Sequence, residues 1–594
     1  MTETKALQCR VRAMLAFAAM CKFNRRGLVL AGFLLVNGIP LSAAELDVKV
    51  EPGNRALREN IENHIGDLGD RDERELLRYS RIARDQAQKA LQALGYYNAV
   101  IDSEVIGGET PRLSMRIVPG PPVRLRNVQV QVEGPATELT GFRNPQGALK
   151  PDAVLNHGSY NEVKQRIVNL ASRFGFFDGR FTRQRLAVDP KENFADIELV
   201  FESGPRYLLG EVSFDGDAPF DADLLERMVP FEPGTPYDSE RVADLNQALQ
   251  SSGYFEGVRV DANPANASDQ HIPISVLLTT REPRTLGLGL GFSTDVGPRI
   301  RLDWTRHWVN PQGHSYGAEA ELSAPRQNVG LWYDVPLDPP LTDKLRYAGG
   351  YQYEELGDND SLSRLLTVGP EWHRLLDNGW QRVWSLKWQH EEYRLGDDSG
   401  LSTLLMPGVA YSLLRSDNRI DPSNGYRLEF ELAAAKQGLM SDADLIHANA
   451  MLKGLSTLFE RHRFLGSVQL GANLTDEYTQ VPPSLRYFAG GDQSVRGYDY
   501  QSLSPTNSDG DRIGGRYQFA MTAEYQYSLT EKWRVATFMD QGNAFNSADF
   551  PSLKSSVGVG VRWVSPVGPI RVDLAHPLDD DGGVRLHFSM GPEL

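Results

Sequence analysis

Apolar and polar side chains alternate with a period of two throughout the second half of the chain. A period of two places successive side chains on opposite faces of a β-strand. From Arg284 onward one face is apolar and the other carries charge, which is typical of strands that form a transmembrane barrel. The 311 residues from Arg284 to Leu594 accommodate about 16 antiparallel strands, at roughly 19 residues per strand and connection. The alternation is clearest at Leu286, Leu288, Leu290 and Phe292, at Ile300, Leu302 and Trp304, and at Val584, Leu586, Phe588 and Met590.

A soluble β-sandwich is the alternative fold for such strands. The aromatic content favours the membrane, because barrels carry belts of aromatic residues where the bilayer meets water. The 24% of charged residues and the mean hydropathy of −0.39 exclude a polytopic helical membrane protein, and the 41% of hydrophobic residues excludes a disordered chain. The tryptophans of this half include Trp304, Trp308, Trp332, Trp372, Trp380, Trp384 and Trp388.

The first 44 residues have the organisation of a secretory signal peptide. A basic segment, Lys22 to Arg26, precedes an apolar run from Gly27 to Ile39, and small residues precede a cleavage point after Ala44. The alternative is a single membrane anchor, but the apolar run is shorter than the ~20 residues that a spanning helix needs. Either Met14 or Met20 could open the same signal, so we expect an over-long start in this segment.

Charge and cysteine content exclude several classes of protein. The formal charge of −16 argues against nucleic acid as the main partner, because phosphate binding needs a basic surface. Removal of residues 1–44 lowers this charge to −21. It also removes Cys9 and Cys21, after which no disulfide, zinc cage or thiol nucleophile is available. An exported, acidic, cysteine-free chain suits the bacterial envelope.

The first half contains three copies of one module. In each copy an amphipathic helix ends at a glycine that is followed by an aromatic residue pair, and a strand and a proline junction come next. The glycines are Gly95, Gly175 and Gly253. The predicted order within each module is strand, helix, helix, strand, strand.

These modules resemble the POTRA domain, a periplasmic polypeptide-binding module. We expect POTRA domains at residues 45–121, 122–205 and 206–283, before a barrel over residues 284–594. The fold class is therefore α+β periplasmic repeats followed by an all-β transmembrane barrel. Three generic α/β spacers are the alternative, although a free sheet edge could still accept an extended client by strand addition.

A motif near the C-terminus strengthens the resemblance. The run Arg486–Tyr498 ends in Val495-Arg496-Gly497-Tyr498, and Phe538-Met539-Asp540-Gln541-Gly542 follows later. Both resemble motifs of the POTRA-plus-barrel superfamily that inserts or exports proteins at outer membranes. The resemblance implies that Arg496 lies on an extracellular loop folded into the lumen and pairs with Asp540 on the barrel wall. It also implies that Gly497 permits a tight turn and that Tyr498 packs on the wall.

Three POTRA modules resemble the TamA branch of this superfamily. The resemblance implies an outer-membrane assembly factor for autotransporter-type barrel proteins, with its POTRA domains in the periplasm. The implied partners are a TamB-like protein anchored in the inner membrane, unfolded outer-membrane clients and outer-membrane lipid. A two-partner-secretion export pore or passive channel and a BamA-like general insertase remain the alternatives.

Two motifs suggest enzymes, and neither has the required context. Gly313-His314-Ser315-Tyr316-Gly317 matches a hydrolase nucleophile elbow, which would make an envelope lipase, but it follows a turn and enters an alternating strand. Gly287-Leu288-Gly289-Leu290-Gly291 resembles a nucleotide loop, but no helix follows it. We therefore predict no catalytic residue, cofactor or metal.

The first and last strands are expected to form a weak seam. Closing a barrel requires the strand near Thr285–Ser293 to pair with the strand near Val584–Gly591. Glycine weakens a strand through backbone entropy and provides no side chain for cross-strand packing. This seam is therefore expected to open sideways towards clients; alternatively, its glycines make room for the inward-folded loop. The seam residues are Leu286, Gly287, Leu288, Gly289, Val584, Leu586 and Phe588.

Overall fold

A computed structural model describes residues 44–216, 219–355, 361–396, 398–547, 552–566, 568–591 and 593–594. The predicted signal peptide lies outside these residues, apart from Ala44. Within the described ranges, no helix has both the length and the apolar content needed to cross a membrane. The chain divides into two compact units, of which the first contains Met1–Gln131, Asn144–Gln165 and Arg183–Val200. The second contains Val132–Arg143, Arg166–Thr182 and Phe201–Leu594.

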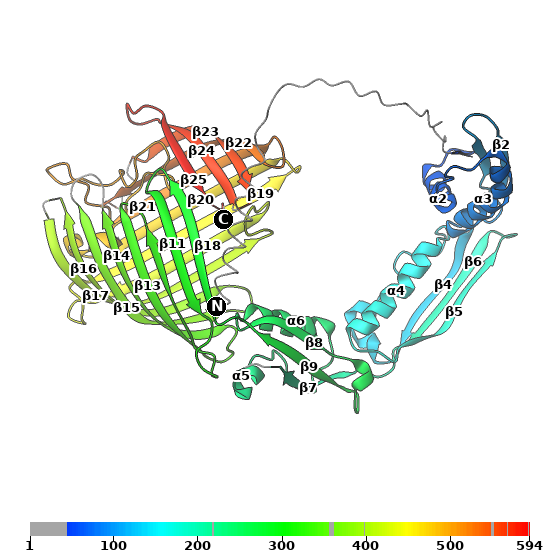
Figure 1. The fold of residues 1–594 in the computed structure, drawn as a ribbon, viewed down its shortest axis with the longest axis horizontal. Helices are drawn as coiled ribbons and strands as arrows, with labels where there is room; N and C mark the ends of the chain where they lie inside the picture. Colours follow the sequence, from blue (N-terminus) through cyan, green and yellow to red (C-terminus); the bar gives the residue numbers. More distant parts are fainter. Residues whose placement is uncertain are drawn as a thin grey trace, which may run out of the picture. The chain divides into compact units, whose positions relative to one another are not determined.

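The first module packs two helices on a three-stranded sheet (Figure 1). Its sheet has the order β1-β3-β2, with β1 parallel and β2 antiparallel to β3. Asp72 and Glu75 form a capping box that fixes the start of the longer helix. Leu76, Ala83 and Ala87 on that helix are fully buried. The elements are β1 (Glu45–Val50), α2 (Arg55–Ile65), α3 (Glu73–Ala93), β2 (Val100–Ile106) and β3 (Arg112–Val118).

The second module replaces the expected first helix with two 3-10 turns. Glycine and proline interrupt this segment at Pro135, Gly141, Pro145 and Gly147, and both residue types disfavour a continuous α-helix. Its sheet has the order β4-β6-β5. The elements are β4 (Arg124–Glu133), η1 (Pro135–Glu138), η2 (Thr140–Phe142), α4 (His157–Arg173), β5 (Arg180–Asp189) and β6 (Phe194–Glu202).

The third module again has two α-helices on a sheet of order β7-β9-β8. The repeated glycines that follow the second helix, Gly95, Gly175 and Gly253, all have φ between +81° and +89°. This left-handed conformation is strained for other residues, so it accounts for the repeat of glycine at this step. The elements are β7 (Leu208–Asp215), α5 (Ala222–Glu226), α6 (Ser239–Ser251), β8 (Phe255–Asp261), η3 (Pro264–Asn266) and β9 (His271–Thr280).

The third module contacts the turn between the second and third strands of the sheet that follows it, at residues 308–313. The Tyr254 hydroxyl donates to the Gly313 carbonyl at 2.6 Å, and the Asp221 amide donates to the Pro311 carbonyl at 2.9 Å. The rings of Phe220 and Trp308 meet edge to face. Only three residues of the sequence separate β9 from the first barrel strand, so the third module lies next to the barrel.

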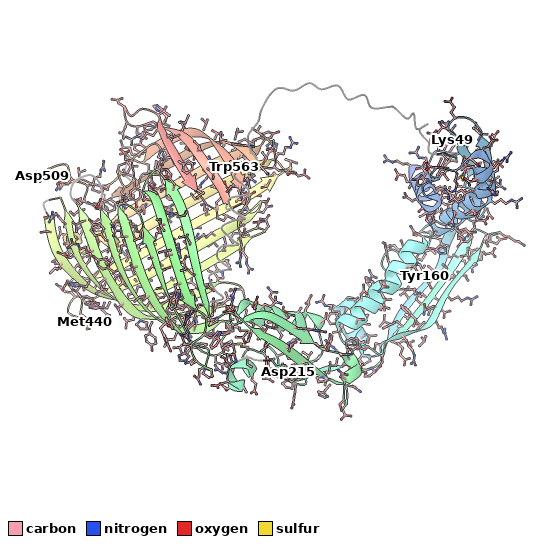
Figure 2. All side chains as sticks on the ribbon, viewed as in Figure 1. Lys49, Tyr160, Asp215, Met440, Asp509 and Trp563 are labelled. Atoms are coloured by element: carbon pink, nitrogen blue, oxygen red, sulfur yellow. The ribbon has the colours of Figure 1, made fainter. Side chains whose placement is uncertain are left out.

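The remaining strands form one antiparallel sheet of 16 strands in sequence order, which confirms the predicted barrel and strand number (Figure 1). Side chains project from both faces of its wall (Figure 2). Leu286, Leu288 and Leu290 are each more than two-thirds exposed, as expected of side chains that face lipid. Ser315 begins a strand, so the residues around it do not form the strand-to-helix turn of a nucleophile elbow.

The sheet contains β10 (Arg284–Ser293), β11 (Gly297–Arg306), β12 (Ser315–Leu322), β13 (Arg326–Pro336), β14 (Asp343–Glu355), β15 (Leu362–Leu375), β16 (Gln381–Leu395), β17 (Asp398–Ser416), β18 (Gly425–Ala435), β19 (Leu445–Leu458), β20 (His462–Leu474), β21 (Tyr517–Ser528), β22 (Trp533–Phe545), β23 (Lys554–Ser565), β24 (Gly568–Pro577) and β25 (Arg585–Met590). Two short 3-10 helices, η4 (Tyr478–Gln480) and η5 (Pro483–Leu485), lie between β20 and β21.

Candidate functional site: the lumen loop and the barrel edges

The long connection between β20 and β21, residues 475–516, folds into the barrel; we refer to it as the lumen loop. It contacts strands on several sides of the wall. The Ser484 amide donates to Glu391 of β16 at 3.2 Å, and the Tyr487 hydroxyl donates to the Ala448 carbonyl of β19 at 2.9 Å. A segment that reaches strands this far apart around the sheet must lie inside it.

Arg496 of the lumen loop makes a bidentate ion pair with Asp540 of β22. Its Nε lies 2.7 Å and its NH2 atom 2.9 Å from the two carboxylate oxygens, and its backbone amide donates to the same carboxylate at 3.1 Å. The guanidinium carbon lies 3.4 Å from the centre of the Phe538 ring. The two side chains are 8% and 0% exposed, so water screens this pair very little.

Two further carboxylates, which sequence analysis missed, complete this cluster. The NH1 atom of Arg496 lies 2.9 Å from Glu524 of β21 and 3.0 Å from Asp573 of β24. Arg562 of β23 bonds to both of these acids from the other side. The alternation of side chains could assign all three residues to the inner face. It could not identify which of the inner-face charges lie beside Arg496, because that depends on how the loop enters the lumen.

The neighbouring motif residues lie close to the wall. Gly497 has a φ of +92°, and its amide donates to Nε2 of His587 at 2.8 Å. The Tyr498 hydroxyl donates to the Ser555 carbonyl of β23 at 3.3 Å. Val495 is fully buried, and a Cβ at Gly542 would lie 2.9 Å from its Cγ2 atom. The lack of a side chain at Gly542 therefore makes room for the side chain of Val495.

The two edge strands of the barrel, β10 and β25, meet over a very short length. Among the described residues, the sheet runs from β10 to β25 without a ladder that joins its ends. The Thr294 amide donates to the Phe588 carbonyl at 3.1 Å, and the Phe588 amide donates to Thr294 Oγ1 at 3.1 Å. The Phe292 and Phe588 rings also meet edge to face. Among the described residues, the predicted full pairing of the first and last strands is therefore replaced by a few contacts of Phe292 and Thr294 with Phe588.

This contact also indicates how the two edges approach each other. β25 meets the chain at the end of β10 rather than at its middle. If the antiparallel arrangement continues from the bond between the Thr294 amide and the Phe588 carbonyl, Ser293 is expected to lie opposite Ser589.

The seam glycines are not explained by a lack of space. A Cβ at Gly287 would lie no closer than 3.5 Å to Asp303, and a Cβ at Gly289 no closer than 3.5 Å to Arg301. Both neighbours belong to β11, and these are ordinary contact distances. Within the described residues, no atom of the lumen loop is among the three nearest neighbours of either position. Alanine would therefore fit at both.

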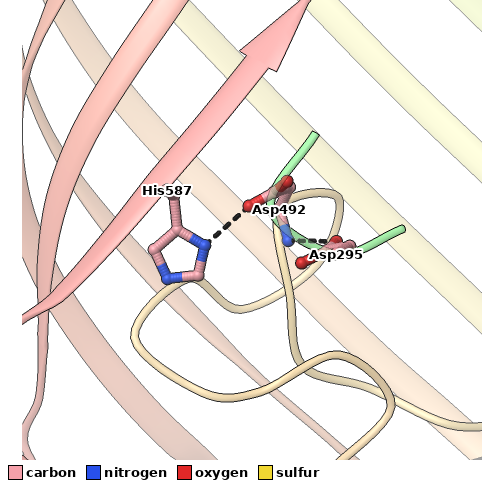
Figure 3. A group of neighbouring side chains, drawn as sticks. All are labelled: Asp295, Asp492 and His587. Carbon is pink, nitrogen blue, oxygen red and sulfur yellow. Dashed lines mark hydrogen bonds and ion pairs between the residues drawn. The ribbon is translucent and has the colours of Figure 1, made fainter. Parts of the chain in front are cut away.

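A cluster of three polar side chains links the lumen loop to both barrel edges (Figure 3). Asp295 lies in the turn after β10, Asp492 in the lumen loop and His587 in β25. Nδ1 of His587 lies 2.6 Å from Asp492 Oδ1, and the Asp492 amide donates to Asp295 Oδ2 at 2.7 Å. The sequence alone does not indicate this cluster, because the three residues are far apart in the chain and match no motif.

Although the three side chains are spaced like cation ligands, the hydrogen bonds do not suit a metal. A backbone amide can only donate, so Nε2 of His587 accepts from Gly497. In the neutral ring Nδ1 then carries the proton, which it donates to Asp492. A histidine that binds a metal instead uses its other nitrogen as a donor. The arrangement therefore favours a hydrogen-bond network.

The two adjacent carboxylates predict a dependence of stability on pH. Burial and the neighbouring Asp492 carboxylate raise the pKa of Asp295, which lies in a turn outside the strands, to about 7. A carboxyl whose pKa is raised by folding stabilises the fold at low pH, and this stability is lost as the pH rises towards 7. We therefore expect Asp295→Asn to raise the unfolding temperature by a few degrees at pH 8 and to change it little at pH 4.

Heat-modifiability on gels measures this temperature. Asp303→Asn is the matched control, because Asp303 pairs with Arg301 at 3.0 Å and its loss should give no gain at pH 8. An equal effect of Asp295→Asn at both pH values would contradict the predicted titration.

Three protein families match the sequence. The Omp85 superfamily domain matches residues 280–593. The family described as POTRA domain TamA domain 1 matches residues 47–119, and the POTRA family described as surface antigen variable number repeat matches residues 207–280.

Similar proteins include outer membrane protein assembly factors named BamA. That of Nitratidesulfovibrio vulgaris is 24% identical over an aligned length of 440, and the alignment covers 68% of this chain and 53% of that protein. That of Neisseria meningitidis is 21% identical over an aligned length of 577, and the alignment covers 84% of this chain and 70% of that protein. The chain thus spans about half the length of the first of these relatives. A similar solved structure is the crystal structure of BamA from Haemophilus ducreyi lacking POTRA domains 1–3. Its TM-score is 0.64 at 15% sequence identity, and the match covers 79% of this chain and 99% of that chain. This similarity shows a shared fold.

Proposed function

Because the chain belongs to the Omp85 superfamily, we propose that it is a non-enzymatic factor that assembles β-barrel proteins in the outer membrane. It is an outer-membrane protein whose POTRA domains lie in the periplasm. Its substrates would be unfolded outer-membrane proteins, with autotransporter-type barrels as the main clients, and it would act on them within outer-membrane lipid.

The observation that supports this function is the pair of nearly unpaired barrel edges. A strand edge presents free N–H and C=O groups that can pair with an incoming strand. Leu286 and Leu288 on β10 and Leu586 on β25 are all exposed, so the adjoining backbone is accessible from the lipid side. Gly287 and Gly289 weaken one edge without any steric need for glycine. Phe588 belongs to the other edge, β25, and Val584 immediately precedes that strand.

We further propose that the chain belongs to the TamA type and works with a TamB-like protein anchored in the inner membrane. The match of residues 47–119 to the first POTRA domain of TamA supports this assignment. A BamA-like general insertase is the second candidate, because the similar curated proteins carry that name. A two-partner-secretion pore is the third.

Depletion of the protein, followed by quantitative proteomics of the outer membrane, separates these candidates. The TamA type predicts a loss confined to a few clients, chiefly autotransporters, with other barrels near normal abundance. A general loss of barrel proteins would favour the BamA-like function. Loss of one secreted protein with all barrels intact would favour the export pore and contradict our proposal.

The first module is expected to contact the TamB-like partner. Its residues 47–119 match the first POTRA domain of TamA, whereas the third module contacts the barrel through Tyr254 and Asp221. Deletion of residues 45–120 should abolish co-purification with the partner while the barrel remains inserted and heat-modifiable. Replacing Tyr254 with phenylalanine is a control that alters the third module and should leave co-purification intact. Partner binding that survives the deletion would rule out this surface.

A further inference from the structure

We infer that Asp492 is a positioning residue that fastens both free edges of the barrel to the lumen loop, so that the seam can open only when this contact breaks. The inference rests on the proposed function, in which the seam admits clients. It assigns control of the seam to the loop that carries Val495-Arg496-Gly497-Tyr498, through a residue outside that motif.

Asp492 bonds to both edges with one carboxylate. The Thr294 hydroxyl at the end of β10 donates to its two oxygens at 2.9 and 3.1 Å. On the other side, Nδ1 of His587 in β25 donates to Oδ1 at 2.6 Å. The side chains of His587 and Asp492 are 8% and 3% exposed, so water competes weakly for these bonds. The same Thr294 hydroxyl accepts the Phe588 amide, which is half of the direct contact between the edges.

The position of Asp492 depends on the loop being seated in the lumen. Gly491 has a φ of +101°, and a Cβ there would lie 2.6 Å from the Asp295 carboxylate, so glycine is required for this approach. The Gly491 amide donates to the Val495 carbonyl at 3.2 Å, which ties Asp492 to the motif.

His587 joins the two halves of this arrangement. One ring nitrogen accepts from the Gly497 amide beside Arg496, and the other donates to Asp492. A continuous series of contacts therefore runs from Asp540 through Arg496, Gly497, His587 and Asp492 to Thr294. If the lumen loop left the lumen, Asp492 would move with it, and its hydrogen bonds to Thr294 and His587 would be lost. Seating of the loop is therefore coupled to closure of the seam.

Amide hydrogen exchange of the full-length protein in lipid nanodiscs tests this inference. The Thr294 and Phe588 amides report the seam, and the Arg496 amide, which donates to Asp540, reports loop seating. Asp492→Ala should accelerate exchange at the two seam amides about tenfold or more, the effect expected when a hydrogen bond to a charged group is lost. Exchange at the Arg496 amide should stay within about twofold of its wild-type rate, because this amide keeps its own bond to Asp540.

Three further variants make the result specific. Asp492→Asn keeps an acceptor and should give an intermediate effect. Asp509→Ala removes an exposed carboxylate from the tip of the same loop and should have no effect (Figure 2). Thr294→Val should accelerate exchange at Phe588, and adding Asp492→Ala to it should add little, because the two substitutions break the same contact.

Unchanged exchange at Thr294 and Phe588 in Asp492→Ala would overturn the inference. Faster exchange at Arg496 as well would also overturn it, because Asp492 would then stabilise the loop as a whole. A change of seam exchange in the wild type on adding EDTA or Zn²⁺ would show that a cation joins the edges. Failure of the proposed function is distinguishable, because client assembly could be unaffected while these exchange rates still respond.

Discussion

Arg496→Ala is expected to yield a barrel that inserts but has lost its seated lumen loop and most of its activity. The arginine contacts three carboxylates, those of Asp540, Glu524 and Asp573, all of them buried. Its removal leaves Arg562 as the closest cation to two of these acids. Breaking a buried ion pair from one side destabilises a protein by about 3–5 kcal/mol, because the remaining charge is uncompensated.

Heat-modifiability and the assembly of a client in proteoliposomes measure this effect. Arg419→Ala is the matched control, since Arg419 is exposed in the turn between β17 and β18. Arg496→Lys should fall between the wild type and alanine, because an ammonium keeps the charge but cannot form the bidentate bond. An Arg496→Ala protein with wild-type activity and heat-modifiability would show that the motif has no role in the lumen.

Exchange of the charges of Arg496 and Asp540 is expected not to restore stability. An aspartate at position 496 would face Glu524 and Asp573 rather than a lone partner. An arginine at position 540 would also lose the bond that the Arg496 amide makes to the present carboxylate. The double variant should therefore be no more stable than either single variant.

The strands of the barrel could be predicted because the side chains on the two faces of each strand differ in polarity. The bilayer and the lumen select opposite side chains, so alternation persists over every strand. The pairing of Arg496 with Asp540 was implied only by family resemblance. Glu524 and Asp573 were not predicted, because contacts between a loop and a wall depend on three-dimensional placement. In the second module, Pro135 and Gly141 were available as helix breakers, but the repeat pattern outweighed them in our prediction.

The register of the seam could not be predicted for a different reason. In a hairpin the turn fixes the register, but β10 and β25 are joined by no turn. Their relation depends on the contacts of Phe292 and Thr294 with Phe588, and on Asp492, which bridges them from a distant part of the chain. Residues so far apart and so different in type leave no periodic pattern in a sequence.

A reversible covalent link across this seam is expected to abolish client assembly. The mature chain predicted here contains no cysteine, so two engineered cysteines would form the only disulfide. From the bond between the Thr294 amide and the Phe588 carbonyl we expect Ser293 to lie opposite Ser589, and directly opposed residues of antiparallel strands have Cα atoms about 4.5–5.5 Å apart. This separation suits a disulfide, whose Cα atoms usually lie about 4.4–6.8 Å apart.

Oxidised Ser293→Cys/Ser589→Cys protein should fail to assemble a client in proteoliposomes, and reduction should restore the wild-type rate. The control is the pair Ala450→Cys/Leu470→Cys, which links the directly opposed strands β19 and β20 inside the wall. That link adds the same bond without closing an edge, so it should leave assembly unaffected. If client assembly requires the free edges of β10 and β25, only the seam link can block it. Full activity of the seam-linked protein, with the disulfide verified by mass spectrometry, would mean that clients are not admitted between these strands.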